Sequence, residues 1–295
     1  MYPVLFTLPG LGWDVQAYGV LMGLALLLGW VLTLRAARAD RLPSERIGTI
    51  YVASVLAAVL TGRAMWLLQQ PGGFDAGALL SLKAGGSSII GALFAGLLVS
   101  GLLCRRAKIP WFAALDCGAP AFAIGVVLER VGAFLAGADF GRYVAPGEFG
   151  YRLHVVYPEG STVFEFHHRA MDALRGLPDT TSAPVHPSQL YTAAFALLAL
   201  ALAGFVRRRR RFSGQVFFAV AGVYLAGRML VEESLRFGAP EGALGPFRVT
   251  QLAAVGLLFV LWIAYQQLAA RAAAAPSGGK HWLGGAWSEP ESEAK

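Results

Sequence analysis

Charged residues are scarce in this chain. Asp, Glu, Lys and Arg make up 15% of the 295 residues, whereas hydrophobic residues make up 56%. The hydrophobic residues gather into runs of about 20, the length that an α-helix needs to cross a bilayer. These two properties argue against one or two soluble globular domains and predict a polytopic helical membrane protein.

Cysteine, metal-ligand spacings and internal repeats are also scarce. The two cysteines, Cys104 and Cys117, flank a basic loop and lack a C-x-x-C pattern, so we expect both to be packing residues in a reducing compartment. His167 and His168 have only Glu165 nearby as a further ligand, which disfavours a metal site. No internal repeat is evident, which disfavours a transporter built from two related halves.

The hydrophobic runs predict seven transmembrane helices. They lie at about 15–34, 47–69, 88–104, 111–136, 188–206, 214–236 and 247–268. The first run is preceded by Asp14 and followed by Arg35 and Arg38, whereas a signal peptide carries its positive charge in front. We therefore expect the first run to be a retained span.

The formal net charge of +7 is concentrated in every second connection between these runs. The basic residues there are Arg35, Arg38, Arg41 and Arg46, then Arg105, Arg106 and Lys108, then Arg207 to Arg211. Short basic connections are typical of cytoplasmic loops, which predicts an N-terminus outside and a C-terminus in the cytoplasm. The same placement favours an interaction of the five-arginine block with anionic lipid over binding of nucleic acid.

The predicted fold class is an all-α membrane protein with a small extracytoplasmic α+β head domain. The connection after the fourth run alternates apolar and polar residues from Tyr151 to Tyr157 and then has a helical pattern from Thr162 to Leu174. The expected divisions are helices one to four with their outer loops in 1–137, the head domain in 138–187, helices five to seven in 188–272, and a disordered cytoplasmic tail in 273–295.

Several polar residues lie at the predicted outer ends of the spans. An intramembrane arginine is costly in hydrocarbon, so it usually faces a cavity or binds an anion. Arg130 has this position in the stretch ERVGAFLAGADFGR, and we interpret it as a ligand of a lipid phosphate. Tyr224, Arg228 and Glu232 are spaced by four and share a helix face, so Arg228 can pair with Glu232. A purely structural salt bridge is the alternative for this pair.

Other polar residues at these ends have two interpretations each. Tyr18 suits an aromatic belt or a hydrogen bond to a headgroup, and Arg63 either snorkels to the interface or faces a cavity. The motif HPSQLY opens the fifth run, where Pro and Ser are ordinary helix-start residues. Helix capping does not explain why His186, Gln189 and Tyr191 occur together at a membrane boundary. These three residues indicate a hydrogen-bonding rim at the outer end of the helix.

In their order and spacing, these residues resemble the prolipoprotein diacylglyceryl transferases of the bacterial inner membrane. The resemblance spans about Ala17 to Ala264 and includes Tyr18-Gly19, Gly62-Arg63, Gly86 to Gly91, Arg130 to Arg142, His186 to Tyr191, and Tyr224 with Arg228 and Glu232. It implies seven spans and a reaction in which a lipobox cysteine thiol attacks the glyceryl carbon of phosphatidylglycerol. Glycerol phosphate leaves, the cysteine keeps a diacylglyceryl thioether, and no metal or soluble cofactor takes part.

The resemblance also implies site residues and partners. The expected catalytic residues are Arg130, Arg228, Tyr18, Tyr224 and Glu232, and the expected substrate-binding residues are Arg63, Gly141, Arg142, His186, Gln189 and Tyr191. The expected partners are phosphatidylglycerol, a prolipoprotein signal peptide with its lipobox cysteine, and membrane lipids, with no nucleic acid. Guanidinium groups suit this reaction because displacement of a phosphate ester develops negative charge that fixed cations stabilise.

The chain departs from the family pattern in two regions. Where the family signature reads Gly-Arg, then Asn-Phe, Asn-Gly and Glu before its glycine, this chain has Glu129-Arg130, Ala133-Phe134, Ala136-Gly137 and Ala138. The histidine proposed as a base in many members aligns with Ile90. A thiol with a pKa of about 8.5 ionises readily in a cationic field, so the reaction can tolerate the absence of this histidine. The alternatives are a paralogue that binds phospholipid with another acceptor or without catalysis, and a transporter.

Overall fold

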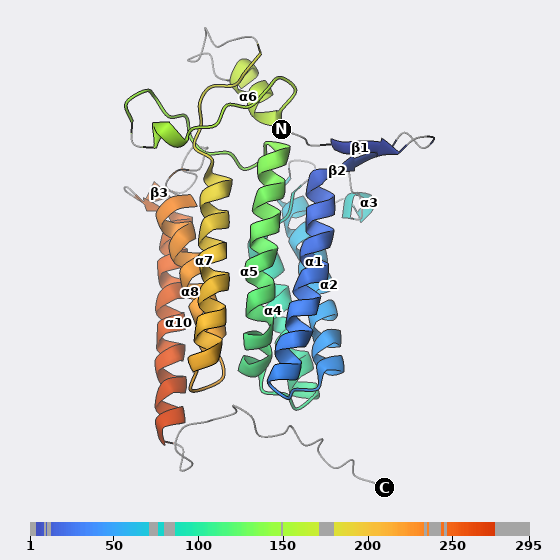
Figure 1. The fold of residues 1–295 in the computed structure, drawn as a ribbon, viewed down its shortest axis with the longest axis vertical. Coiled ribbons are helices and arrows are strands. Elements are labelled where there is room, and N and C mark those ends of the chain that lie inside the picture. The colour runs from blue at the N-terminus through green and yellow to red at the C-terminus, as the bar shows by residue number, and fades with distance from the viewer. Residues whose placement is uncertain are drawn as a thin grey trace.

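The protein is a bundle of long helices with an irregular cap at one end (Figure 1). The computed structural model describes residues 4–8, 10, 13–70, 76–79, 86–148, 150–170, 180–232, 235, 243–244 and 247–274. Six helices in this part of the chain are long and apolar enough to cross a membrane: α1 (Ala17–Ala39), α2 (Ser44–Leu68), α4 (Ile89–Arg106), α5 (Trp111–Ala136), α7 (Ser188–Arg209) and α10 (Val249–Ala274). The chain is a multi-pass membrane protein, as its hydrophobic runs predict.

The remaining predicted span is shorter than the other six. Helix α8 (Gln215–Gly227) continues into the π-helical segment η3 (Arg228–Glu232), and its apolar part covers Gln215–Val231. A π-helical turn hydrogen-bonds from residue i to i+5, which widens the helix and is frequent at functional sites. The predicted spacing of four therefore holds as far as Arg228 and changes there.

Two short β-hairpins and a short helix accompany the long helices in the part of the chain that the structure describes. A hairpin of β1 (Val4–Leu8) and β2 (Trp13–Gln16) precedes α1, and β3 (Ala243–Leu244) pairs with β4 (Phe247–Arg248) before α10. The short helix α3 covers Ala76–Leu79. The predicted disordered tail, apart from the last two residues of α10, lies outside the described residues.

Helix α5 is the centre of the bundle. It packs against α1, α7 and α8, while α2 packs against α4. The buried cluster between α5, α7 and α8 consists mainly of small residues: Ala119, Ala123, Ala199, Ala203, Val216 and Val220. Small side chains let helices approach closely in a membrane, where van der Waals packing replaces the hydrophobic effect as the force between helices.

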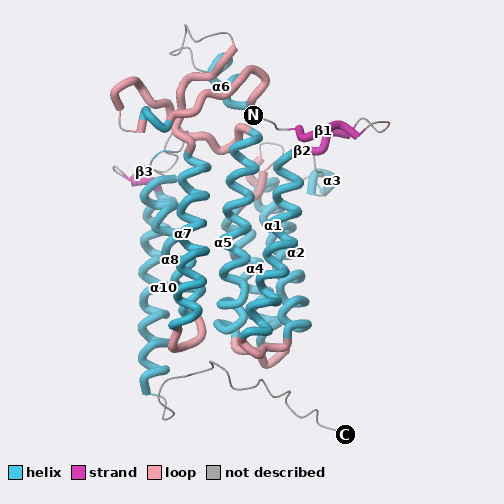
Figure 2. The backbone as a smooth tube through the Cα atoms, viewed as in Figure 1, coloured by secondary structure: helices cyan, strands magenta, loops and turns pink. Residues whose placement is uncertain are grey.

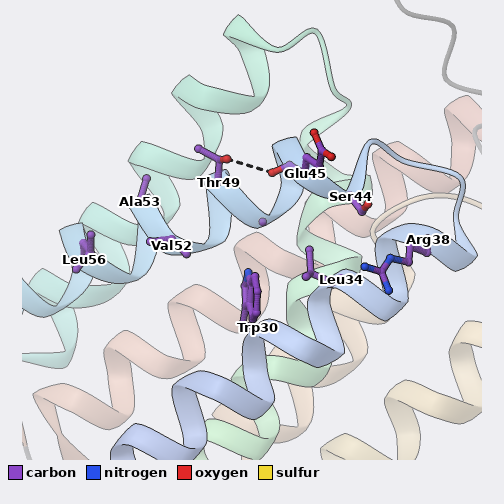
Figure 3. A pocket seen from close by; sticks show the side chains of 10 residues that line it. Trp30, Leu34, Arg38, Ser44, Glu45, Thr49, Val52, Ala53 and Leu56 are labelled. Atoms are coloured by element: carbon purple, nitrogen blue, oxygen red, sulfur yellow. Dashed lines mark hydrogen bonds between the residues drawn. The ribbon is translucent and has the colours of Figure 1, made fainter.

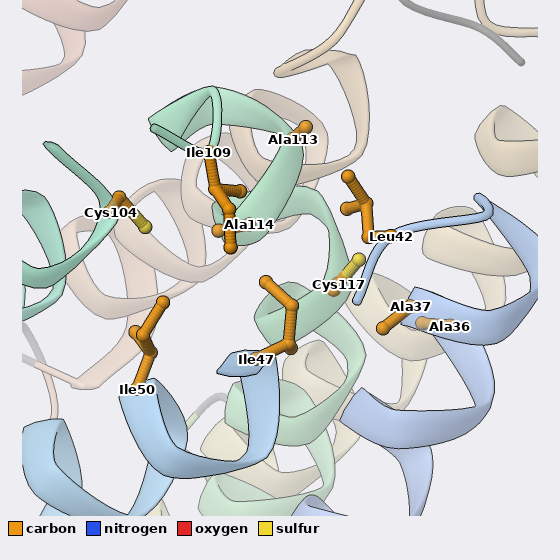
Figure 4. Packing of buried hydrophobic residues seen from close by; sticks show 10 residues of the cluster. All are labelled: Ala36, Ala37, Leu42, Ile47, Ile50, Cys104, Ile109, Ala113, Ala114 and Cys117. Carbon is orange, nitrogen blue, oxygen red and sulfur yellow. The ribbon is translucent and has the colours of Figure 1, made fainter. Parts of the chain in front are cut away.

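The three basic connections lie together at one end of the bundle, which we call the basic end (Figure 2). These connections join α1 to α2, α4 to α5, and α7 to α8. A hydrophobic cluster packs beside them, consisting of Ala36, Ala37, Leu42, Ile47, Ile50, Cys104, Ile109, Ala113, Ala114 and Cys117 (Figure 4). Both cysteines are fully buried in this cluster, which confirms their predicted role in packing.

Two arginines of the five-arginine block at the basic end form ion pairs within the protein, contrary to the prediction that the block contacts lipid. Arg207 Nη2 lies 2.7 Å from an oxygen of Asp40, and Arg210 contacts both Asp40 and Asp116. Asp116 is fully buried and also accepts hydrogen bonds from the backbone N–H groups of residues 214 and 217. Only Arg208, Arg209 and Arg211 are exposed, so the interpretation of the whole block as a lipid anchor is wrong for two arginines.

The opposite end, which we call the capped end, is covered by the described residues between α5 and α7, which are 137–148, 150–170 and 180–187. This cap contains the 3-10 helix η1 (Tyr151–Leu153) and the helix α6 (Thr162–Ala170), packed around buried Tyr157, Val163 and Val185. The predicted strand over Tyr151 to Tyr157 is wrong. Gly150 has a φ of 86° and starts η1, after which only isolated bridges form, such as Val155 with Val185. Tyr157 is fully buried but Leu153 is 61% exposed, so the alternation in the sequence does not follow the core of the cap.

Candidate functional site

Arg130 lies near the capped end of α5, between two carboxylates. Its side chain is 9% exposed, with Nε 3.0 Å from Oε2 of Glu129 and Nη1 3.4 Å from Oδ2 of Asp139. Helix α5 ends in left-handed Gly137, and Asp139 is itself left-handed at a φ of 52°, a conformation that Asp tolerates. These two left-handed residues turn the chain back, so that the Asp139 side chain contacts Arg130.

Tyr18 faces this ion pair from the neighbouring helix α1. The charges of Glu129, Asp139 and Arg130 all act on its hydroxyl group. The close approach depends on Gly132, because a Cβ there would lie 3.1 Å from the Tyr18 ring and 3.3 Å from its Cα. The structure therefore brings together two predicted catalytic residues, Tyr18 and Arg130.

Tyr224 and Arg228 lie next to each other on α8 and η3. Arg228 Nη1 donates a 3.4 Å hydrogen bond to the Tyr224 hydroxyl, which confirms the predicted shared face of these two residues. The Tyr224 ring packs edge-on against Phe122 of α5, with centroids 5.0 Å apart. The side chain of Glu232 lies outside the described residues, so its predicted pairing with Arg228 stays a prediction.

Helix geometry gives the relative depth of the two arginines. Helices α5 and α8 both run from the basic end to the capped end, and the contact of Phe122 with Tyr224 marks a common level. Arg130 is then about 12 Å above this level and Arg228 about 6 Å above it, at 1.5 Å per residue. The two positions therefore differ by about 6 Å along the helix axes.

Arg63 lies on α2, at the capped end of the bundle. It is buried, its Nη1 donates a 2.9 Å hydrogen bond to the carbonyl of Gly86, and its guanidinium lies 5.0 Å from the centre of the Trp66 ring. Gly86 has a φ of 117°, and any side chain there would clash with Trp66. These contacts exclude simple snorkelling to the interface and fix the Gly-rich entry of α4 against α2.

Gly141 lies where three chain segments cross beneath the cap. Its N–H donates to the carbonyl of His186 at 3.0 Å, and the next N–H, of Arg142, donates to the carbonyl of Leu235 at 2.7 Å. A Cβ at position 141 would lie 2.9 Å from the Leu235 oxygen and closer still to that of His186. Only glycine fits this crossing, which ties the cap to α7 and to the segment after η3. The Arg142 side chain is exposed.

His186 and Tyr191 form one corner of the cap. The His186 ring is 1% exposed, packs against Gly150, and lies with Nδ1 3.5 Å from the Tyr191 hydroxyl. Burial, together with the positive charge of Arg142, lowers the pKa of His186 despite the opposing charge of Glu148. The ring is therefore neutral at neutral pH, and it shapes the cap instead of presenting a cation to a phosphate.

Gln189 links α7 to the cap from a fully buried position. Its Nε2 donates to the carbonyl of Ala138 at 2.6 Å and to the Tyr157 hydroxyl at 3.1 Å, while the neighbouring Ser188 hydroxyl donates to the carbonyl of Asp139 at 2.9 Å. The HPSQLY motif thus holds the turn that presents Asp139 to Arg130. Tyr157 takes part in this network, and the only sequence feature around it is the alternation of apolar and polar residues.

A groove of about 600 Å³ lies elsewhere, between α1 and α2 toward the basic end (Figure 3). Trp30, Leu34 and Leu56 give it an apolar floor, with Arg38 and Glu45 at one end. None of the predicted site residues lines it. Within the described residues, no three His, Cys, Asp or Glu side chains come together as potential metal ligands.

The chain is thus a polytopic helical membrane protein in which Arg130 is buried near the capped end and Arg228 lies on the adjoining helix. The family model described as prolipoprotein diacylglyceryl transferase matches residues 3–266. The chain belongs to this family and is a transferase. This result confirms the resemblance that the motifs carry, despite the departures at Glu129, Ala133 and Ile90.

Individual relatives extend along most of the chain. The chain is 28% identical to the phosphatidylglycerol–prolipoprotein diacylglyceryl transferase of Thermus thermophilus over 83% of this chain and 91% of that protein. Proteins of the same name match from Geobacter sulfurreducens, at 30% identity over 85% and 88%, and from Finegoldia magna, at 23% over 90% and 96%. The match therefore includes the helices, the cap and the site together.

Proposed function

We propose that the protein transfers the diacylglyceryl group of phosphatidylglycerol to the lipobox cysteine thiol of prolipoproteins. The sulfur forms a thioether with the glyceryl carbon, and glycerol phosphate leaves. The observation that supports this proposal is that Arg130 and Arg228 lie on two helices that pack together, α5 and α8 with its continuation η3, both toward the capped end. The names of the relatives, which contain this donor and this acceptor, support it.

The two arginines stabilise the charge that develops on the leaving phosphate. As the carbon–oxygen bond breaks, the phosphate oxygen gains negative charge, and guanidinium groups bind such oxygens bidentately. Partial burial strengthens this interaction because the surrounding dielectric is low. Tyr224 orients Arg228 through the 3.4 Å hydrogen bond, and Tyr18 positions the headgroup or the thiol beside Arg130. Glu232 orients Arg228 from the next turn.

The orientation of the protein follows from its charge. The basic end faces the cytoplasm, since short loops rich in Arg and Lys are retained there. All seven helices cross the bacterial inner membrane, with the N-terminus outside and the C-terminus in the cytoplasm. The cap at 138–187 is then an extracytoplasmic head domain that guides the signal peptide to the outer leaflet. Arg63, Gly141, Arg142, His186, Gln189 and Tyr191 form the walls of this substrate site.

The test is transfer by the purified protein. Labelled phosphatidylglycerol and a lipobox peptide are incubated with the wild type, with Arg228→Ala and with Arg208→Ala, an exposed arginine at the basic end. We expect transfer by the wild type and by Arg208→Ala, and its loss by at least about 100-fold in Arg228→Ala, because the cation that stabilises the transition state is removed. Full activity of Arg228→Ala contradicts the assigned role. Lipid binding without transfer by the wild type identifies a non-catalytic paralogue.

A further inference from the structure

The groove between α1 and α2 has an exposed apolar wall and a charged end. Trp30, Val52 and Leu56 line it and are 40%, 47% and 57% exposed. Arg38 and Glu45 lie together at the other end (Figure 3). Both helices are long and apolar enough to cross a membrane, so exposed apolar side chains on them face hydrocarbon.

The groove follows the seam between two pairs of helices. Helix α1 packs mainly against α5, and α2 packs mainly against α4. At the bottom of the seam, a Cβ on Gly48 would lie 3.1 Å from Cδ2 of Leu34 and 3.4 Å from Nε1 of Trp30. Glycine therefore lets these two side chains of α1 pack onto the backbone of α2, where they form the floor of the groove.

The length of the groove matches one leaflet of a bilayer. Arg38 and Trp30 are about 12 Å apart along α1, and Glu45 and Leu56 are about 16 Å apart along α2, at 1.5 Å per residue. Half of the hydrocarbon core of a bilayer is about 15 Å thick. The charged end adjoins the connection from α1 to α2, at the basic end of the bundle. The groove thus has its polar and apolar parts in the order of a phospholipid headgroup and acyl chain.

The charge at the basic end of the groove favours an anion. Arg35, Arg38 and Arg41 are all exposed there. In the part of the chain that the structure describes, no carboxylate lies within ion-pair distance of the Arg38 side chain, although Glu45 lines the same end. Asp40, the other acidic residue of this connection, binds Arg207 and Arg210. A phosphate at the mouth of the groove can therefore neutralise Arg38.

We propose that this groove binds an anionic phospholipid of the leaflet at the basic end, which the proposed orientation makes the cytoplasmic leaflet. Its phosphate contacts Arg38, and the Ser44 hydroxyl at the same end is a further donor. One acyl chain lies along Trp30 toward Leu56. This lipid is not the donor of the transfer reaction, because Arg130 lies at the capped end. It covers the seam between the two pairs of helices and joins them in the membrane.

The test is quenching of Trp30 fluorescence in bilayers that contain the full-length protein. Phosphatidylserine or phosphatidylcholine with brominated acyl chains is added, because bromine quenches a tryptophan that it contacts. The difference between the wild type and Trp30→Phe isolates the signal of Trp30. We expect an apparent affinity about fivefold higher for the phosphatidylserine than for the phosphatidylcholine, the effect of roughly one arginine on an anionic lipid. Arg38→Gln should abolish this preference.

Two variants with exposed side chains serve as comparisons. Arg208→Gln removes an arginine at the same end of the bundle that does not line the groove, so the preference should remain. Glu45→Gln removes the negative charge beside Arg38 and should increase the preference. An unchanged or weaker preference in Glu45→Gln would contradict the proposal even if Arg38→Gln did not fold.

Three further outcomes would overturn the proposal. Equal quenching by the two lipids in the wild type would show that the groove contacts bulk lipid without selecting a headgroup. A preference that persists in Arg38→Gln would place the phosphate elsewhere. Absence of quenching by either lipid would show that a polypeptide segment covers Trp30. The assay does not measure transfer, so each of these failures leaves the proposed function standing.

Discussion

Replacement of Arg210 by alanine should destabilise the protein far more than replacement of Arg208, two residues earlier in the same arginine block. The Arg210 side chain is 9% exposed and contacts Asp40 and Asp116, which are 12% and 0% exposed. Removing the guanidinium leaves the fully buried carboxylate of Asp116 without its ion-pair partner, whereas Asp40 keeps Arg207. Breaking a buried ion pair on one side costs about 3–5 kcal/mol.

Asp116 keeps two hydrogen bonds in the Arg210→Ala variant, because two backbone N–H groups at 2.8 and 2.9 Å still donate to it. These bonds place the expected loss toward the lower part of the range, at about 3 kcal/mol. Arg208 is exposed, and removing an exposed charge changes stability by about 0.5 kcal/mol or less.

The assay is the free energy of unfolding in detergent micelles, measured by denaturant titration for the wild type and both variants. Adding anionic lipid to the micelles provides a second comparison. If the block acted only as a lipid anchor, the two variants would lose similar stability, and both losses would depend on anionic lipid. Equal stability of Arg210→Ala and Arg208→Ala would therefore refute the inward-facing arrangement of Arg210.

Two further predictions concern the cap. Gly141→Ala should destabilise the protein by about 2–3 kcal/mol, because its Cβ overlaps two carbonyl oxygens, whereas Gly118→Ala, with open space around its Cβ, should be neutral in the same unfolding titration. Burial lowers the pKa of His186, so the unfolded state binds its proton more readily, and stability should fall as pH drops below about 6.5 and be constant above it. His186→Gln should show a shallower loss between neutral and mildly acidic pH, and an unchanged slope would contradict this burial effect.

Hydrophobic length predicted six of the helices because the bilayer imposes one requirement on each span. It was less informative for α8, where the helix changes to π-helical geometry at Arg228 within a continuous apolar run. The side-chain pattern does not reveal that change, because hydrogen bonding of the backbone determines it. The strand predicted at Tyr151 is wrong because left-handed Gly150 starts a 3-10 turn there, and Leu153 of the alternating pattern is 61% exposed.

The charge pattern of the sequence predicted where the arginines lie in the bundle better than it predicted which side chains they contact. A run of arginines indicates which end of a bundle is basic, but it does not indicate which side chains turn inward, since that depends on Asp40 and Asp116 from distant segments. The same limit applies to Arg130. Its place near the end of a span indicated an anion ligand, whereas the carboxylates on both sides of it became evident only from the fold.

The central claim is that Arg130 and Arg228 act on the same phosphate, and a double-mutant cycle tests it most directly. Transfer of labelled diacylglyceryl to a lipobox peptide is measured as kcat/KM for Arg130→Lys, Arg228→Lys and the double variant, which keep both charges but lose the bidentate geometry. We expect a coupling energy above about 1 kcal/mol, because both side chains stabilise one leaving group. Effects that add to within about 0.5 kcal/mol would mean that the two arginines work at separate places.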